Sequence, residues 1–329
     1  MRMQKTAAFL LCLCLLLAFP VRAAEEPVRI AFIDTGISAM NLDAAHIGEG
    51  KNYALPEYDT SDRIGHGTAT AGMVLGAAEL GVTGVFPEAV VIPLVVVDRY
   101  PAGTQANGGT EALCQALRDA VDLFHCRVIN VSLSASEDSE ALQSAVAYAE
   151  EQGAVVVAAA GNGEGVYYPA AYPTVISVGT ADGAGPAAFS SSGADVLWPG
   201  AELLSVTNRA RERTETVSGT SFSCACAAGL CARILSEQPE LTPAEVRERI
   251  FGMAEDIGEA GYDPASGWGV LPADTTPVLQ VPSAETLREY LRRYAPKVKQ
   301  DAALRAALEN LVRQHPELLQ WEKQLKSDK

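Results

Sequence analysis

Ser221 stands where a small, polar loop turns into an almost wholly apolar run that extends to Leu235. A run without a polar face predicts a buried helix. At the start of that helix the Ser221 hydroxyl would meet unpaired backbone N–H groups and the positive end of the helix dipole, which together stabilise an oxyanion. Ser221 is therefore a candidate nucleophile, although a serine in this position is also a common N-cap.

Three further residues carry chemistry that complements a hydroxyl. Asp34 follows the apolar run 27–33, His66 lies between two glycines, and Asn162 follows the apolar run 154–160. Carboxylate, imidazole, amide and hydroxyl are the groups that acyl transfer requires. Each has an ordinary alternative: Asn162 suits a left-handed turn and a single histidine is often structural. The Asp-Thr-Gly at Asp34 also occurs in aspartic peptidases, but these need two such loops and this chain has one.

Apolar runs alternate with amphipathic segments between residues 28 and 272, and this alternation predicts the elements that position the four side chains. The expected strands are residues 27–33, 89–97, 127–132, 154–160, 174–179 and 195–198, with a closing turn and strand at 267–271. The expected helices follow His66 and span residues 110–124, 139–152, 221–235 and 243–253. We predict an α/β domain with a mostly parallel sheet and helices on both faces. Open sheets of this kind place their sites at the carboxyl ends of the strands, where Asp34 would lie.

The ends of the chain differ from this domain in composition. Residues 1–23 have a basic start, a 13-residue apolar core and small residues before Ala24, which predicts a secretory signal peptide and a secreted or extracytoplasmic protein. Residues 24–275 form the predicted main domain. A proline-containing linker leads to residues 276–329, where three helical stripes predict a small helical extension that either docks on the main domain or binds a protein partner. We expect no transmembrane segment in the mature chain.

The net charge and the cysteine content restrict the classes of partner, metal site and disulfide that we expect. The formal net charge is −16, and it becomes about −19 once the three bases of the signal peptide are removed, which argues against nucleic acid as a partner. Five cysteines remain, at positions 114, 126, 224, 226 and 231. Their spacing matches no zinc site, and we expect reduced packing residues, with a bridge between Cys114 and Cys126 as a less favoured alternative.

Taken together, four motifs resemble the subtilase (subtilisin-like) serine peptidases. They are residues 32–36 (Phe-Ile-Asp-Thr-Gly), 66–68 (His-Gly-Thr), 159–162 (Ala-Ala-Gly-Asn) and 219–221 (Gly-Thr-Ser). The order Asp, His, Ser along the chain is also that of subtilisin. Residues 130–133, 189–193, 198–200 and 267–269 add further matches, so that the resemblance covers residues 28–272.

The resemblance implies a secreted serine endopeptidase that acts on a protein or peptide substrate through an acyl-enzyme. Ser221 would be the nucleophile, His66 the general base and acid, and Asp34 the residue that orients His66. The Asn162 side chain and the Ser221 backbone N–H would bind the oxyanion. Two substrate-flanking edges are implied, one formed by Ser132, Leu133 and Ser134 and the other by Ala159, Ala160 and Gly161.

The chain also departs from the family pattern. Ala69 stands where the family usually has His, Ser134 replaces a usual Gly, and Cys224-Ala225-Cys226 replaces Ser-Pro-His directly behind the nucleophile. Only residues 24–27 separate the predicted signal peptide from the main domain, where secreted members normally have a folding pro-domain. The family's calcium loop is shortened near Glu79, so we expect no metal or other cofactor, although Asp43 matches one calcium-ligand position. These departures motivate the alternative function of a catalytically weak or inactive subtilase-like protein that binds a protein partner.

Overall fold

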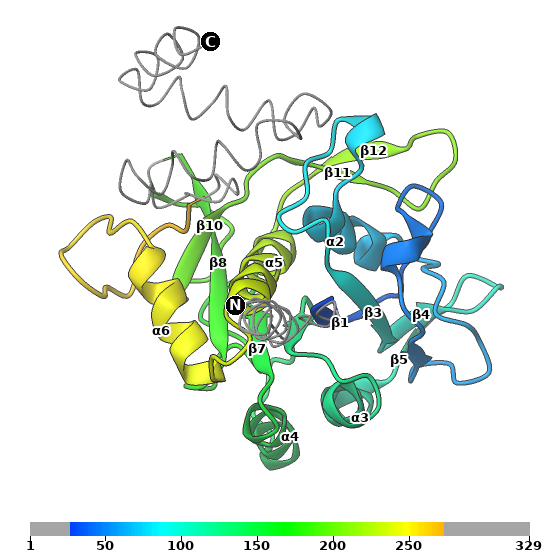
Figure 1. Ribbon diagram of the computed structural model, residues 1–329, viewed down its shortest axis with the longest axis horizontal. Coiled ribbons are helices and arrows are strands. Elements are labelled where there is room, and N and C mark those ends of the chain that lie inside the picture. The colour runs from blue at the N-terminus through cyan, green and yellow to red at the C-terminus, as the bar shows by residue number, and fades with distance from the viewer. Residues whose placement is uncertain (1–26, 184, 273–329) are drawn as a thin grey trace, which may run out of the picture. The chain divides into compact units, whose positions relative to one another are not determined.

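The computed structural model describes residues 27–183 and 185–272 and contains one large parallel sheet. Its strands lie in the order β10-β8-β7-β6-β1-β3-β2, and β9 pairs antiparallel with β8 (Figure 1). The strands are β1 (Arg29–Asp34), β2 (Lys51–Asn52), β3 (Val90–Val95), β6 (Val128–Val131), β7 (Val155–Ala159), β8 (Ile176–Asp182), β9 (Gly185–Pro186) and β10 (Val196–Pro199). The predicted α/β class with a mostly parallel sheet is therefore confirmed.

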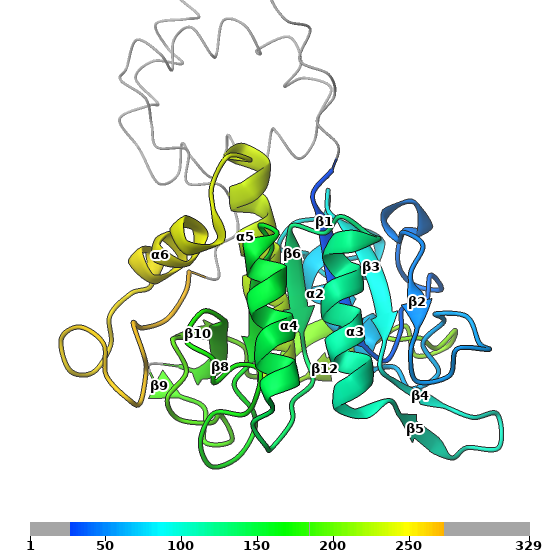
Figure 2. The same cartoon turned by 90° about the horizontal axis from the view of Figure 1, so that it is seen from below.

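Helices cover both faces of this sheet. In Figure 2, α3 and α4 lie on one face, and α2 and α5 lie behind the strands on the other. The helices are α2 (His66–Leu75), α3 (Gly109–Asp122), α4 (Glu140–Glu151), α5 (Thr220–Glu237) and α6 (Pro243–Met253). Each face has its own hydrophobic cluster, because the central strands are apolar on both sides. The strand that ends at Asp34 is thus packed against hydrophobic side chains on both faces of the sheet.

The helix α5 is the central element of its layer. Fourteen of its 18 residues are buried, as the absence of a polar face predicts. Its small side chains allow α2 to pack closely beside it, and the two helices bring His66 and Ser221 to the same end of the sheet. Because most of α5 is buried, its first turn, which contains Ser221, is held in a fixed position.

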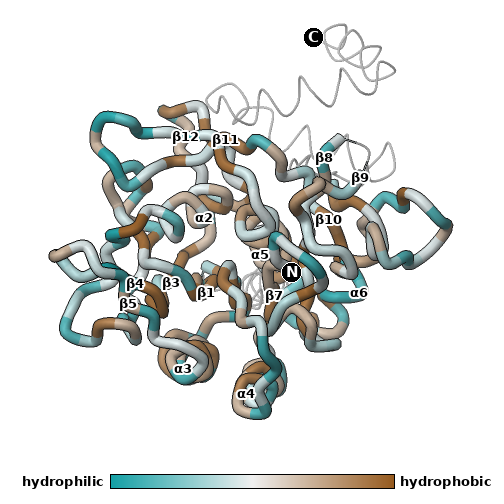
Figure 3. The backbone as a smooth tube through the Cα atoms, turned by 180° about the vertical axis from the view of Figure 1, so that it is seen from behind, coloured by the Kyte–Doolittle hydropathy of each residue, from teal (hydrophilic) through white to brown (hydrophobic). Residues whose placement is uncertain are grey.

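Two antiparallel hairpins were not predicted from the sequence. One joins β4 (Val97–Arg99) to β5 (Gln105–Asn107), and the other joins β11 (Leu203–Val206) to β12 (Thr214–Val217). Short 3₁₀ turns occur at Ala44–His46 and Ala78–Leu80. The loop that joins β11 to β12 is among the hydrophilic segments of the chain (Figure 3), which explains why no strand periodicity marks this hairpin.

Other predicted elements shift or shorten. The strand expected at residues 174–179 runs from Ile176 to Asp182, and the strand expected at 267–271 is reduced to single bridges of Val270 with Leu197 and Glu255. The capping box between Thr242 and Glu245 forms at the start of α6. The predicted signal peptide, the boundary at residue 275 and the helical extension all lie outside the described residues.

The five cysteine thiols at positions 114, 126, 224, 226 and 231 are free, as the sequence favours. Burial raises the pKa of the Cys126 and Cys231 thiols to about 12 and raises that of Cys224 as well. They are packing groups that stay protonated near neutral pH. No helix within residues 27–183 and 185–272 is long and apolar enough to cross a membrane.

Candidate active site

Asp34 and His66 meet at the carboxyl end of β1. Asp34 is the last residue of β1 and fully buried, and His66 is the first residue of α2. The Asp34 Oδ1 atom is 2.7 Å from His66 Nδ1 and accepts a hydrogen bond from the Thr35 backbone N–H. The other carboxylate oxygen accepts from the Thr70 hydroxyl at 3.0 Å. Both oxygens are thus held, and the carboxylate orients the imidazole ring.

A glycine makes the close approach of these two segments possible. A Cβ atom at Gly67 would lie 2.2 Å from the Gly36 carbonyl oxygen, so that any larger residue would push α2 away from the end of β1. The Gly67 N–H donates to the Thr35 hydroxyl at 2.8 Å. The glycine that follows His66 in the sequence therefore has a steric role, which its position in the motif alone did not reveal.

Asp62 organises the turn before His66 and was missed in the sequence. Its carboxylate accepts hydrogen bonds from the backbone N–H groups of Ile64 and Gly65 at 2.9 and 2.7 Å. It also accepts from the N–H and hydroxyl of Thr68 at 2.8 and 2.6 Å. One sequence signal could have identified Asp62. It is a carboxylate four residues before the histidine, at the start of a helix whose first backbone N–H groups have no partner within the helix.

The electrostatic surroundings raise the pKa of His66. Burial by itself lowers that pKa, but the charge of Asp34 and its hydrogen bond outweigh the burial, and Asp62 adds a further favourable charge. Because the Asp34 carboxylate accepts a hydrogen bond from His66 Nδ1, the neutral imidazole carries its proton on Nδ1. The Nε2 lone pair is then free to accept a proton from a group in front of it.

Ser221 is the second residue of α5. The N-cap is Gly219, which has φ of 145°, so the reading of Ser221 as an N-cap is wrong. A Cβ atom at Gly219 would lie 3.8 Å from the Asn162 side-chain nitrogen, in a backbone conformation that side chains rarely adopt. A side chain at Gly219 would therefore be strained by the backbone conformation and not by lack of space.

The Ser221 hydroxyl rests on a neighbouring carbonyl. It donates to the Ser132 carbonyl oxygen at 3.0 Å, and the Ser132 hydroxyl donates back to the Ser221 carbonyl oxygen at 3.1 Å. Ser132 itself accepts from the Asn130 side chain at 2.8 Å. In the free protein the hydroxyl therefore points to Ser132 and not to the His66 ring, which lines the same groove.

Asn162 is exposed, and only the oxygen of its side-chain amide makes hydrogen bonds to the described residues. Its side-chain oxygen accepts from the Thr220 backbone N–H at 3.1 Å and from the Thr220 hydroxyl at 3.3 Å. Its NH₂ group donates to no group in the described part of the chain. The positive φ belongs to the neighbouring Gly161, so the left-handed turn suggested for Asn162 is wrong.

A groove of about 800 Å³ runs past Ser221 and His66 and is lined by residues 132–139. The backbone of Leu133 and Ser134 makes no hydrogen bond to the described parts of the chain, so this edge is free to pair with another strand. The other expected edge differs. Ala159, Ala160 and Gly161 are buried, do not line the groove, and the N–H and C=O groups of the last two are bonded internally. That either edge flanks a substrate stays a prediction.

The residues near the shortened calcium loop do not fit a calcium ion. The Asp43 carboxylate accepts from the Ala45 N–H as a helix cap. The carbonyl oxygens of Ala77, Ala78 and Val82 accept hydrogen bonds from N–H groups of their own loop. Calcium needs six to eight oxygen ligands, and this loop brings no cluster of three acidic side chains together to supply them. Within residues 27–183 and 185–272, no group of three His, Cys, Asp or Glu side chains is placed to hold a metal ion.

Comparisons with known proteins agree with this geometry. A family model described as the subtilase family matches residues 26–269. Subtilisin DY of Bacillus licheniformis is 36% identical over 246 residues, which are 71% of this chain and 86% of that protein. The minor extracellular protease Epr of Bacillus subtilis (strain 168) is 33% identical over 74% of this chain and 37% of its own length. A solved structure, S41 psychrophilic protease, has a TM-score of 0.66 and 30% identity over 75% of this chain and 91% of its own.

Proposed function

The chain belongs to the subtilase family of serine endopeptidases, and we propose that it cleaves peptide bonds with Ser221, His66 and Asp34 as its catalytic triad. The observation that carries this assignment is the 2.7 Å contact between Asp34 Oδ1 and His66 Nδ1, because it presents His66 Nε2 to the groove that contains Ser221. These are the roles and the geometry that acyl transfer by a triad requires.

The first step begins with a rotation of Ser221. Its hydroxyl leaves the Ser132 carbonyl and donates to His66 Nε2, which accepts the proton as Ser221 Oγ attacks the substrate carbonyl carbon. Asp34 stabilises the imidazolium that forms. When the tetrahedral intermediate collapses, His66 gives this proton to the leaving amine, and the acyl group remains on Ser221. Water then repeats the same steps with His66 as base, which releases the acid and restores Ser221.

Two N–H donors would stabilise the negative charge that develops on the substrate carbonyl oxygen. The Asn162 NH₂ is unpaired within the described residues, and the Ser221 N–H lies in the first turn of α5, where a helix leaves its N–H groups without partners. An oxyanion between them would receive two hydrogen bonds from groups fixed before the reaction. The free backbone of Leu133 and Ser134 would pair with the substrate chain beside it.

We further propose that the protein acts outside the cytoplasm. This rests on the signal-peptide pattern of residues 1–23 and on the relationship to a protein named an extracellular protease. The mature chain would start at Ala24, which N-terminal sequencing of the exported protein tests. A partner for residues 276–329 stays a proposal that no observation on the described residues supports.

A fluorophosphonate probe tests the peptidase assignment directly. Purified residues 24–329 are expected to bind the probe covalently, and the Ser221→Ala variant is expected not to, since the probe reacts with an activated serine hydroxyl. Labelling of both proteins to the same extent, or of neither, would contradict the assignment. Binding of a peptide substrate without labelling or cleavage would instead favour the alternative of an inactive subtilase-like binding protein.

A further inference from the structure

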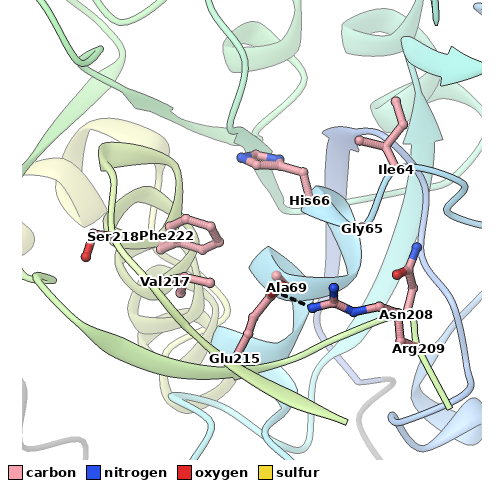
Figure 4. Close-up of a pocket in the computed structure, with 10 residues that line it drawn as sticks. All are labelled: Ile64, Gly65, His66, Ala69, Asn208, Arg209, Glu215, Val217, Ser218 and Phe222. Carbon is pink, nitrogen blue, oxygen red and sulfur yellow. Dashed lines mark hydrogen bonds and ion pairs between the residues drawn. The ribbon is translucent and has the colours of Figure 1, made fainter. Parts of the chain in front are cut away.

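A second pocket shares His66 with the groove of residues 132–139 and is otherwise lined by different residues. It has a volume of about 410 Å³, and Figure 4 shows its lining residues. Its walls combine apolar and charged side chains from α2, α5, β12 and the loop between β11 and β12. Those that matter here are Ala69, Val217, Phe222, Arg209 and Glu215.

The position of this pocket relative to His66 indicates which part of a substrate enters it. His66 lines both the pocket and the groove, whereas Ser221 and residues 132–134 line only the groove. The acyl half of a substrate pairs with the free edge in the groove. Because His66 gives its proton to the leaving amine, the leaving half extends from the scissile bond past the imidazole. The pocket therefore lies where the side chain after the scissile bond would go.

The wall nearest His66 is apolar. The Phe222 ring is buried and its centre is 5.5 Å from the centre of the His66 ring. Val217 lies beside it at the end of β12. These two side chains offer a surface for the aliphatic or aromatic part of a substrate side chain.

The far wall holds an ion pair between Arg209 and Glu215, and a second carboxylate, that of Glu212, contacts the same arginine from outside the pocket lining. Arg209 Nη2 is 2.9 Å from Glu215 Oε2, and Arg209 Nη1 is 3.3 Å from Glu212 Oε2, so one guanidinium faces two carboxylates. Figure 4 shows the Arg209–Glu215 pair crossing the pocket beside Ala69. The Arg209 side chain is 52% exposed and that of Glu215 37% exposed. An ion pair this exposed is weak, and another cation can replace Arg209 at small cost.

We propose that this pocket binds the residue directly after the scissile bond and that Glu215 selects a basic side chain there. The inference rests on the proposed peptidase function. The aliphatic stem of a Lys or Arg packs against Val217 and Phe222, and its charged head reaches Glu215. Arg209 is the chain's own competitor for that carboxylate. An acidic side chain at the same position meets the Glu215 carboxylate, with that of Glu212 beyond the pocket lining, and is disfavoured.

The experiment compares three internally quenched peptides that differ only after the scissile bond, where they carry Lys, norleucine or Glu. The enzyme produced from the full chain is used, and mass spectrometry of the products verifies the bond cleaved. We expect the ratio of kcat/KM for Lys over Glu to exceed 1 in the natural protein. Glu215→Gln is expected to lower this ratio about fivefold and Arg209→Ala to raise it by a similar factor, the upper range for one exposed ion pair.

Two variants serve as matched controls. Glu212→Gln removes the same charge as Glu215→Gln from a residue outside the pocket lining, and Arg211→Ala removes an exposed arginine of the same loop. We expect a smaller change than Glu215→Gln from the first and no change from the second. The effects of Glu215→Gln and Arg209→Ala should also shrink at high salt, since exposed charges are screened.

The outcomes separate the inference from the function on which it rests. If the natural protein cleaves the peptides but its ratio is at or below 1, or if Glu215→Gln leaves the ratio unchanged, the inference is wrong and the peptidase function stands. A shift from Glu212→Gln as large as that from Glu215→Gln would assign the effect to overall charge and also contradict it. Failure of the natural protein to react with a fluorophosphonate removes the peptidase function and the inference together.

Discussion

The Asn162 amide shows how one side chain can be both anchored and available. Thr220 donates twice to the amide oxygen, which fixes the orientation of the side chain although Asn162 itself is exposed. The nitrogen donates to no group among the described residues and lies 3.8 Å from where a Cβ atom at Gly219 would stand. A donor that is fixed before the reaction stabilises a developing charge without reorganising, and this makes it more effective than a mobile one.

Asn162→Ala is therefore expected to lower kcat by ~10²–10³-fold with little change in KM, because the NH₂ group acts on the transition state and not on the bound substrate. Steady-state kinetics on one peptide measures both constants. Asn162→Asp is the informative companion, since it keeps an oxygen for Thr220 and loses the donor. Near-normal kcat in either variant would remove Asn162 from the oxyanion site.

The raised pKa of His66 sets the acid limit of activity. His66 must be neutral to accept the Ser221 proton, so kcat/KM should fall as the pH decreases through the pKa of His66. Since Asp34 and Asp62 raise that pKa, the midpoint is expected above about 6.5, the ordinary value for histidine. A profile of kcat/KM from about pH 5 to 9 gives the midpoint. A midpoint below the ordinary value would contradict this account.

Asp34→Asn tests how Asp34 affects the pKa and the orientation of His66. It removes the main charge that raises the pKa of His66, so the acid midpoint should move to lower pH. It also loses the acceptor that fixes the proton on Nδ1, so kcat should fall by about 10⁴. A loss of rate without a shift of the midpoint would indicate that Asp34 only positions the ring.

At the scale of elements, α5 is tied to β6 through a thiol. The Cys224 thiol lies 3.1 Å from the side-chain oxygen of Asn130, and Asn130 is fully buried. The nitrogen of the same amide donates to Ser132, which in turn contacts Ser221. The cysteine that departs from the family pattern thus completes a hydrogen-bonded connection behind the nucleophile.

Cys224→Val should destabilise the protein by about 1–3 kcal/mol, because it leaves the Asn130 oxygen buried without a donor. Cys224→Ser retains a donor at that position and should cost less. Urea unfolding followed by fluorescence gives both free energies. Equal stability of the Val and Ser variants would show that the thiol acts by packing alone.

The loop at residues 77–82 leads to an expectation about metal. Its carbonyl oxygens are used within the loop, and Arg213 contacts Asn41 at 2.8 Å and Glu79 at 3.8 Å beside it. We therefore expect EDTA or added calcium to change the melting temperature by less than about 2 °C, since neither would bind or remove a ligand. A saturable rise in melting temperature with calcium would contradict this.

At the scale of the whole molecule, every residue assigned to the site lies between residues 34 and 222. The proposed catalytic side chains come from β1, α2 and α5, and Asn162 follows β7, so all depend on one sheet and its two layers of helices. A chain that ends after residue 276 contains all of these elements. We expect it to remain soluble and to label with a fluorophosphonate as the full chain does. Insoluble or unlabelled protein would assign residues 277–329 a part in folding.

The sequence by itself indicated the four candidate catalytic groups and determined which strands are buried. Apolar runs mark buried strands because local composition reports burial, and Asp34 and Asn162 each follow such a run, whereas His66 and Ser221 begin runs of small residues that form helices. It also determined that α5 is enclosed, since no face of that helix is polar. Element ends were less certain, as the shifted β8 shows.

Only the tertiary structure decided which groups meet. The Asp34–His66 contact spans 32 residues and the Ser132–Ser221 contact spans 89, and both depend on the strand order and on the packing of α5 beside α2. The sequence could not place Arg209 against Glu215, because periodicity describes one element at a time. Pairings between distant segments arise from how those elements pack, and that packing separates the acyl groove from the charged pocket that shares His66 with it.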